Sequence, residues 1–229
     1  MILPRGSLRR PGRVPLPLTS LRERLLHIDG ELARAADPDP WLGRAAALAR
    51  RADPDPGHGT RVAELAGRLA LVLGWPAASA EQLRRAAELH DIGKFALSRS
   101  LLLHPGPLGP GQRELLILHT HAAAWLLGGL DHPVLRLACL IGRAHHERWD
   151  GGGYPDRAAG ADIPLPARIV AACDVWDALT HPRPYRAALS PAEAADTLRS
   201  MAGTALDPDL GAALLDLLDP CPRPTPVAT

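Results

Sequence analysis

Apolar residues recur at three- and four-residue intervals along much of this chain. The segments 61–74 (RVAELAGRLALVLG) and 81–93 (EQLRRAAELHDIG) show the pattern clearly, and such spacing is typical of amphipathic helices. Alanine, leucine and arginine dominate, whereas aromatic residues make up only 3% of the chain. These abundant residue types favour helix. The sequence therefore predicts an all-α fold in which the helices form a bundle.

Segments rich in proline and glycine separate the expected helices. Examples are the two DPDP strings at 37–40 and 53–56 and the segment DGGGYPD at 150–156. Clustered prolines and glycines usually interrupt helices. We expect helices near 20–36, 41–51, 58–74, 80–91, 111–128, 133–147, 166–180, 191–202 and 207–218.

The length of 229 residues suits one main domain with short extensions. We expect residues 58–218 to form this domain, preceded by a flexible leader (1–19) and an N-terminal helical cap (20–57). Residues 219–229 are expected to form a disordered tail. The leader lacks the apolar core of a signal peptide, and no apolar run is long enough to span a membrane.

Charge and cysteine usage restrict the location and the partners. The net charge of +1 gives no overall attraction to DNA, RNA or an anionic membrane. The three cysteines form no CxxC pair, which argues against a disulfide framework and fits a reducing compartment. We therefore expect a cytoplasmic protein that binds neither a nucleic-acid polymer nor a membrane.

Histidines and aspartates at regular intervals are the main chemical signal. His-Asp and His-His pairs, at 90–91 and 145–146, close two of the expected helices. An aspartate inside the apolar run RIVAACDVWDAL is costly to bury unless it is paired or metal-bound. Intervals of 26 to 32 residues, each about one helix and one loop, separate the candidate ligands along the chain. Successive helices could thus bring them to one centre: His58, His90, Asp91, His119, His145, His146 and Asp174.

The donor set indicates the kind of metal. Five histidines and two aspartates without cysteine suit iron, manganese, nickel or zinc better than magnesium or calcium. Seven ligands are too many for one catalytic metal, so we expect two metals bridged by Asp91. Such a pair can activate a bridging water for displacement at phosphorus. A single histidine is more often structural; His121 competes with His119, and the rest are read as structural or solvated (His27, His104, His132 and His181).

Lys94 is the only lysine among 26 lysine and arginine residues. It could have survived by chance in an arginine-rich chain. Alternatively, it does something that arginine cannot, because the two side chains differ in shape, hydration and capacity for pKa change.

Several strings, taken together, resemble the HD-GYP subgroup of the HD-domain metal phosphohydrolases. They occur in the family's order over roughly residues 55–210. HD alone is unspecific, but HHE followed by DGxGYP, an aspartate and RPYR is highly specific. The matching strings are HGTRV (58–62), HDIGKFALSRSLLLHPGPL (90–108), RELLILH (113–119), HHERWDGGGYP (145–155), IPLPARIVAACDVWDAL (163–179) and RPYR (183–186).

The resemblance implies an all-α HD-domain fold and hydrolysis of cyclic di-GMP. By the same mapping His119 is the ligand in preference to His121, and Arg183 and Arg186 contact substrate phosphates. Lys94 matches the family's active-site lysine, and Tyr154 belongs to the loop that gives the family its name. We expect Asp91 and Lys94 to act in the chemical step.

One departure from the family limits the number of metals. Some members carry a glutamate four residues before the first histidine as a ligand of a third metal, whereas this chain has Pro54 there. Asp53 and Asp55 flank that position in the wrong register for direct replacement. We therefore expect two divalent transition-metal ions, iron or manganese first, with zinc or nickel as alternatives.

The leading hypothesis is a cyclic di-GMP phosphodiesterase in which a metal-bridging hydroxide opens the ring to pGpG, with GMP as a further product. A second hypothesis is a phosphohydrolase for another nucleotide or cyclic dinucleotide. A third is a sensor of cyclic di-GMP without turnover, although the complete ligand set argues against it. A protein regulator, a diguanylate cyclase and a second copy of the chain are candidate partners, and regulation would act through residues 1–57 or a partner.

Overall fold

The protein is described by a computed structural model that covers residues 39–183 and 186–219. Over these residues the chain forms helices joined by turns and loops, and it contains no strand, only two isolated bridges. The prediction of an all-α fold is confirmed. The expected leader, the expected helix 20–36 and most of the expected tail lie outside the described residues.

Three helices form the N-terminal part of the described chain. Helix α2 spans Asp39–Ala52, α3 spans His58–Val72 and α4 spans Ala77–Ala87. Helix α3 packs along α4 through buried leucines such as Leu69 and Leu83. The prolines of the α2–α3 connection fit its role as a helix break.

The middle of the chain, residues 92–144, forms four further helices. The 3₁₀ helix η1 spans Ile92–Ala96, and it is followed by α5 (Arg99–Leu102), α6 (Pro110–Leu127) and α7 (Pro133–Ala144). Helix α6 packs against both η1 and α7. The two short helices η1 and α5 were not expected, because each has too few residues to show a periodicity.

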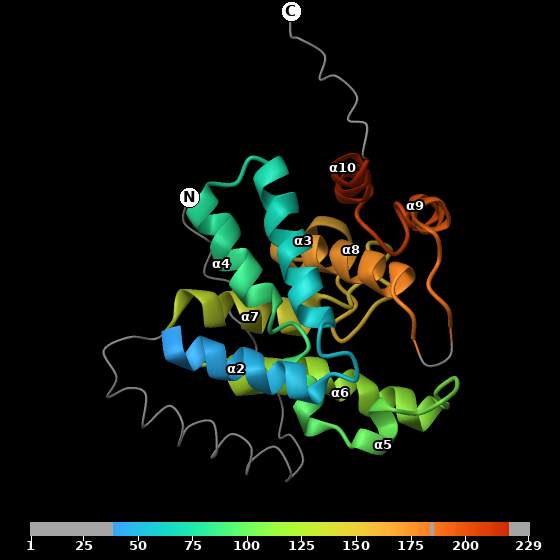
Figure 1. Cartoon of the computed structure of the whole chain (residues 1–229). Helices are drawn as coiled ribbons and strands as arrows, with labels where there is room; N and C mark the ends of the chain where they lie inside the picture. The colour runs from blue at the N-terminus through green and yellow to red at the C-terminus, as the bar shows by residue number, and fades with distance from the viewer. Residues whose placement is uncertain (1–38, 184–185, 220–229) are drawn as a thin grey trace, which may run out of the picture.

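Helix α8 is the centre of the C-terminal part. After the short η2 (Gly160–Asp162), α8 spans Leu165–Thr180, followed by α9 (Pro191–Ser200) and α10 (Pro208–Leu218). Helix α8 packs against α3, α7, α9 and α10, and Figure 1 shows it between α3 and the last two helices. Its position beside α3 brings its aspartates close to His58 at the start of α3.

Two helices end three or more residues earlier than their patterns predicted, and candidate ligands follow both ends. The helix expected over 80–91 ends at Ala87, and the helix expected over 133–147 ends at Ala144. The apolar pattern continues into the turns that follow because those turns are buried as well. Periodicity reports burial, so it could not distinguish these turns from another half-turn of helix.

Within residues 39–183 and 186–219, no helix is both long enough and apolar enough to cross a bilayer. The buried core instead joins the helices to one another.

Candidate metal centre

His90 and Asp91 lie in a tight turn between α4 and η1. The backbone N–H of His90 donates to Ala87 O at 3.1 Å, and that of Lys94 donates to Asp91 O at 2.9 Å. These bonds span three residues, as in a 3₁₀ helix. Nε2 of His90 lies 3.2 Å from Oδ2 of Asp91, so this turn directs two adjacent side chains at one centre. Adjacent residues of an α-helix would diverge by about 100°.

Three of the histidines are oriented in the same way. Nδ1 of His90, His119 and His145 lies 2.8, 2.5 and 3.1 Å, respectively, from a backbone carbonyl one helical turn earlier. A carbonyl can only accept, so each Nδ1 carries a proton, and in a neutral imidazole of this tautomer Nε2 has the free lone pair. Metal-binding histidines are usually fixed by such a bond from the second ring nitrogen.

His58, at the start of α3, is held by a carboxylate instead. Its Nδ1 lies 2.7 Å from Oδ2 of Asp177 on α8, and Nε of Arg61 donates to the other oxygen of Asp177 at 2.6 Å. Burial would raise the pKa of Asp177, but hydrogen bonds from His58 and Arg61 lower it to about 2. The ionised carboxylate therefore orients the His58 ring and leaves Nε2 directed at the cluster.

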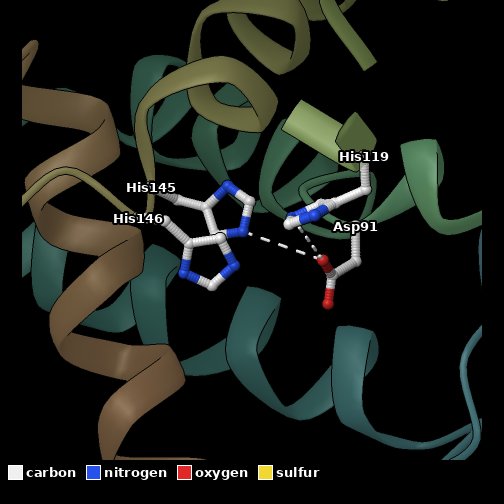
Figure 2. Close-up of side chains that lie close together, drawn as sticks. All are labelled: Asp91, His119, His145 and His146. Atoms are coloured by element: carbon white, nitrogen blue, oxygen red, sulfur yellow. Dashed lines mark ion pairs between the residues drawn. The ribbon is translucent and has the colours of Figure 1, made fainter. Parts of the chain in front are cut away.

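The histidines converge on the two oxygens of Asp91. Oδ1 of Asp91 lies 3.5 Å from Nε2 of His119 and 3.7 Å from Nε2 of His145 (Figure 2). Oδ2 lies 3.2 Å from Nε2 of His90 and 3.9 Å from Nε2 of His58. Each carboxylate oxygen thus faces its own pair of imidazoles, as a bridging ligand between two metals would.

Two groups of potential ligands share Asp91. One consists of Asp91, His119, His145 and His146, and the other of His58, His90 and Asp91; within each group the ligand atoms lie within 4.8 Å of one another. Asp174 on α8 lies next to the second group, with its Oδ1 3.2 Å from Nε2 of His58. The structure thus brings all seven predicted residues together.

Unpaired polar atoms in this cluster fit a metal. Nε2 of His90, His119 and His145 and Oδ1 of Asp91 are buried and have no hydrogen-bond partner among the described residues. Buried polar atoms without a partner destabilise a fold. Because imidazole nitrogen and carboxylate oxygen are both good ligands for first-row transition metals, the cluster can hold metal, and bound ions would satisfy these atoms.

The electrostatics keep His119, His146 and Asp91 in metal-binding form, whereas His58 holds a proton. Burial lowers the pKa of His119 to about 4 and that of His146 well below its usual value, so these imidazoles are neutral. Burial would raise the pKa of Asp91, but Lys94 and His90 hold it well below its usual range. Burial would lower the pKa of His58, but Asp174 and Asp177 raise it to about 10, so a metal at its Nε2 must displace a proton.

Lys94 lies beside the shared aspartate. Its Nζ is 2.5 Å from Oδ2 of Asp91 and 3.0 Å from Oδ2 of Asp53. Burial alone would lower the pKa of Lys94, but these two carboxylates raise it, so the side chain is an ammonium ion at the edge of the cluster.

Arg183 and Arg186 lie in the loop after α8, where their backbones pair through two hydrogen bonds of 2.8 and 3.0 Å. Nη2 of Arg183 is 4.0 Å from Oδ2 of Asp177, and the guanidinium of Arg186 donates to Ala178 O. The two side chains thus contact the C-terminal part of α8, and both residues lie in a loop.

Tyr154 packs beside the ligand histidines. The centre of its ring is 4.8 Å from that of His146 and 6.5 Å from that of His119, and its backbone N–H donates to His146 O at 3.2 Å. Burial raises the pKa of Tyr154, so the phenol keeps its proton and can donate a hydrogen bond. His121, two residues after His119, belongs to neither ligand group.

The family assignment follows from the sequence comparison. The family model described as "HD domain" matches residues 19–210. The chain belongs to the HD domain family. This confirms the resemblance inferred from the HD, HHE and RPYR strings at the level of the family.

Two curated relatives of this HD domain are phosphodiesterases by name. A "Cyclic di-GMP phosphodiesterase" of Thermotoga maritima is 37% identical over 160 residues, which are 70% of this chain and 44% of the relative. A "3'3'-cGAMP-specific phosphodiesterase 2" of Vibrio cholerae is 35% identical over 162 residues, or 71% of this chain and 31% of the relative. The chain therefore spans less than half the length of either relative.

A solved structure supports the fold. Bd1817, an HDG"Y"P protein from Bdellovibrio bacteriovorus, aligns with a TM-score of 0.61 at 20% identity, over 88% of this chain and 70% of that one. At this identity the likeness concerns the fold of the HD domain alone.

Two residues of the HD domain's centre were missed by sequence reasoning. Asp177 lies 119 residues from His58 along the chain, and no pattern links the two. Asp53 was considered only as a substitute for a missing metal ligand, at the wrong register. Its contact with Lys94 spans 41 residues and depends on how α2 packs on η1.

Proposed function

We propose that this HD domain is a metal-dependent phosphodiesterase that opens cyclic di-GMP to linear pGpG, with GMP as a further product. The observation that carries the proposal is the pair of ligand groups that share Asp91. A binuclear centre of this kind suits hydrolysis at phosphorus. The name of the Thermotoga maritima relative supports cyclic di-GMP as the substrate.

The proposed ligands are the seven residues of the cluster: His58, His90, Asp91, His119, His145, His146 and Asp174. We propose two divalent ions, iron or manganese in the first place and zinc or nickel as alternatives, since the donors are nitrogen and carboxylate oxygen. When bound, such ions supply a nucleophilic water at neutral pH and polarise a phosphoryl oxygen. Pro54, which has no ligand atom, supports two ions and not three.

The cations around the centre suit a substrate with two phosphodiesters. The ammonium of Lys94 can neutralise charge on the phosphoryl group that reacts, beside Asp91. Arg183 and Arg186 can hold the second phosphate, because guanidinium groups bind phosphate oxygens in pairs. The Tyr154 hydroxyl can donate to the substrate from the His146 side of the cluster.

A different cyclic dinucleotide is the main alternative, and it is favoured by the Vibrio cholerae relative named for 3'3'-cGAMP. A phosphohydrolase for another nucleotide is also tested by the experiments below. A sensor without turnover is disfavoured, because such a protein would not need all seven ligands. The cytoplasmic location, a homodimer, a diguanylate cyclase and a protein regulator stay predictions.

The first experiment measures metal and products together. Protein purified without added metal is analysed for metal content, loaded with iron or manganese and incubated with cyclic di-GMP, 3'3'-cGAMP and pGpG. We expect about two metals per chain and formation of pGpG. Substrate binding without hydrolysis in the metal-loaded protein would overturn the catalytic proposal.

A pair of histidine variants provides the matched control. His119→Ala removes a proposed ligand, and His121→Ala removes a histidine outside both groups. We expect His119→Ala to lose metal and to reduce kcat strongly. Loss of a residue that only supports a metal ligand typically costs about 10–100-fold, and loss of a ligand should cost more. His121→Ala should keep metal and activity. Equal effects of the two changes would contradict the assignment.

The role of Arg183 is tested by substrate comparison. Arg183→Met should raise the KM for cyclic di-GMP about 10-fold or more, since a charge-assisted hydrogen bond contributes about 1.5–3 kcal/mol. The KM for bis(p-nitrophenyl) phosphate, which has one phosphodiester, should change much less. An equal change for both substrates would show that Arg183 acts through Asp177 and not on the second phosphate.

A further inference from the structure

Asp53 is fixed at the end of α2 by its own backbone turn. Its N–H donates to Ala49 O at 3.1 Å, and its Oδ1 accepts the N–H of Asp55 at 2.8 Å. Such an aspartate turn fixes the direction of the carboxylate, and Pro54, with its restricted φ, stiffens it further. The Asp53 side chain is only 6% exposed.

The second oxygen of this carboxylate faces Lys94. Oδ2 of Asp53 accepts a hydrogen bond from Nζ of Lys94 at 3.0 Å, while the same Nζ lies 2.5 Å from Oδ2 of Asp91. The Lys94 side chain is 16% exposed. The ammonium thus lies between one carboxylate that both ligand groups share, Asp91, and another that belongs to neither group, Asp53.

This arrangement restricts a flexible side chain. Ordering a lysine side chain costs up to about 2 kcal/mol of rotamer freedom. With Asp91 as its only partner, the ammonium could swing around that carboxylate. A second, rigid partner on the opposite side removes this freedom. Of the three N–H donors of Lys94, two are used by Asp53 and Asp91, and the third can reach a substrate oxygen.

The two aspartates of the DPDP string therefore have different partners. Oδ2 of Asp55 accepts from Nη2 of Arg61 at 2.6 Å, whereas Asp53 reaches the active-site lysine. Another contact of α2 with this region is independent of Lys94: Nη1 of Arg50 lies 2.5 Å from Oε1 of Glu88. Asp53 could hold α2 in place or hold Lys94 in place. Breaking the Arg50–Glu88 ion pair disturbs only the contact of α2, so it distinguishes the two roles.

We propose that Asp53 is a positioning residue that holds the Lys94 ammonium beside Asp91, oriented toward the reacting phosphate. The proposal rests on the proposed phosphodiesterase activity. It makes the end of α2 part of the catalytic apparatus, although α2 supplies no proposed metal ligand and no proposed substrate contact.

A double-mutant cycle tests the route of the effect. Asp53→Asn keeps the shape of the side chain but removes its charge. We expect kcat to fall about 10–100-fold, the range seen for outer-shell partners, with KM within about threefold and metal content unchanged. If Asp53 acts through Lys94, the same change in a Lys94→Met background should alter kcat less than about twofold, because coupled residues are not additive.

The lone lysine permits a readout that needs no substrate. Protein labelled with ¹⁵N-lysine has a single Nζ, so one NMR signal reports Lys94. Ammonium protons held in hydrogen bonds exchange slowly with water and remain visible. We expect the signal in the wild type and its broadening or loss in Asp53→Asn. Arg50→Gln, which breaks the neighbouring ion pair of α2, should retain the signal and the activity.

Four results would contradict the positioning role of Asp53, and a fifth would contradict the proposed function. Normal kcat in Asp53→Asn, loss of metal in that variant, additive effects with Lys94→Met, or an equal loss of signal in Arg50→Gln would overturn the positioning role. A wild type that hydrolyses no phosphodiester while its Lys94 signal still depends on Asp53 would overturn the proposed function instead. The two failures are therefore distinguishable.

Discussion

The histidines proposed as metal ligands differ in what holds their second ring nitrogen. His90, His119 and His145 use backbone carbonyls of their own turns, so their orientation is set locally. His58 depends on Asp177 from another helix. Its orientation is therefore the one most sensitive to a single side-chain substitution elsewhere.

Replacing Asp177 tests this dependence. Asp177→Asn keeps the size of the side chain but removes the charge that faces His58 and Arg61. We expect metal affinity to fall about 10–100-fold, as for other outer-shell partners. Competition with a chelator of known affinity measures the change.

An exposed aspartate provides the control for this substitution. Asp196 on α9 pairs only locally, with Arg199 at 2.7 Å, and such surface pairs contribute about 0–1 kcal/mol. Asp196→Asn should leave metal affinity unchanged. The orienting role of Asp177 is wrong if both variants bind metal as tightly as the wild type.

The turn between α4 and η1 owes its position to a close approach to α6. A Cβ atom on Gly93 would lie 1.9 Å from His119 O and 2.8 Å from Ala123 N. These neighbours are backbone atoms, which cannot move aside as a flexible side chain would. Glycine at this position therefore lets the segment that carries His90 and Asp91 lie against the helix that carries His119.

Adding one methyl group should disrupt this contact. We expect Gly93→Ala to lower the free energy of unfolding by about 3 kcal/mol or more, at or above the usual range for overpacking, and to weaken metal binding. Denaturant unfolding and metal analysis measure the two effects.

The same substitution elsewhere should have the opposite sign. A Cβ atom on Gly111, in the first turn of α6, would meet no neighbouring atom within 4 Å. Gly111→Ala should stabilise the protein by about 0.5–1 kcal/mol, because alanine favours helix and restricts the unfolded chain. A neutral Gly93→Ala would show that η1 and α6 can separate without cost.

The proposed metal centre takes its ligands from elements spread over much of the described chain. These proposed ligands come from α3, the α4–η1 turn, α6, the end of α7 and α8. A ligand that binds only the folded state stabilises it by about 2.7–4.1 kcal/mol at 100 to 1,000 times its dissociation constant. Bound metal should thus raise the stability of the whole domain.

Chelation should therefore lower Tm. We expect removal of metal to reduce Tm by about 5–15 °C, from about 2–4 °C per kcal/mol for a chain of this size, and re-addition of metal to restore it. Differential scanning calorimetry measures the shift. His119→Ala should show a smaller response than His121→Ala, and an unchanged Tm after verified metal removal would contradict the stabilising role.

Most of the described helices and six of the seven clustered residues could be predicted from local patterns, and the family resemblance selected His119 over His121. Apolar spacing depends on which face of a helix is buried, and His-Asp and His-His pairs near helix ends remain visible in a linear sequence. The same patterns extended two helices too far, because buried turns are as apolar as buried helices. Residues of the expected helix 20–36 lie outside what the structure describes.

Tertiary packing decided the rest of the centre. Asp177 reaches His58 across 119 residues, and Asp53 reaches Lys94 across 41. Neither pair has a spacing that a helix or a turn would dictate. Such ion pairs depend on which helices lie side by side. The burial of apolar faces determines the packing of the helices, and the pattern of apolar residues does not indicate the partner of a given carboxylate.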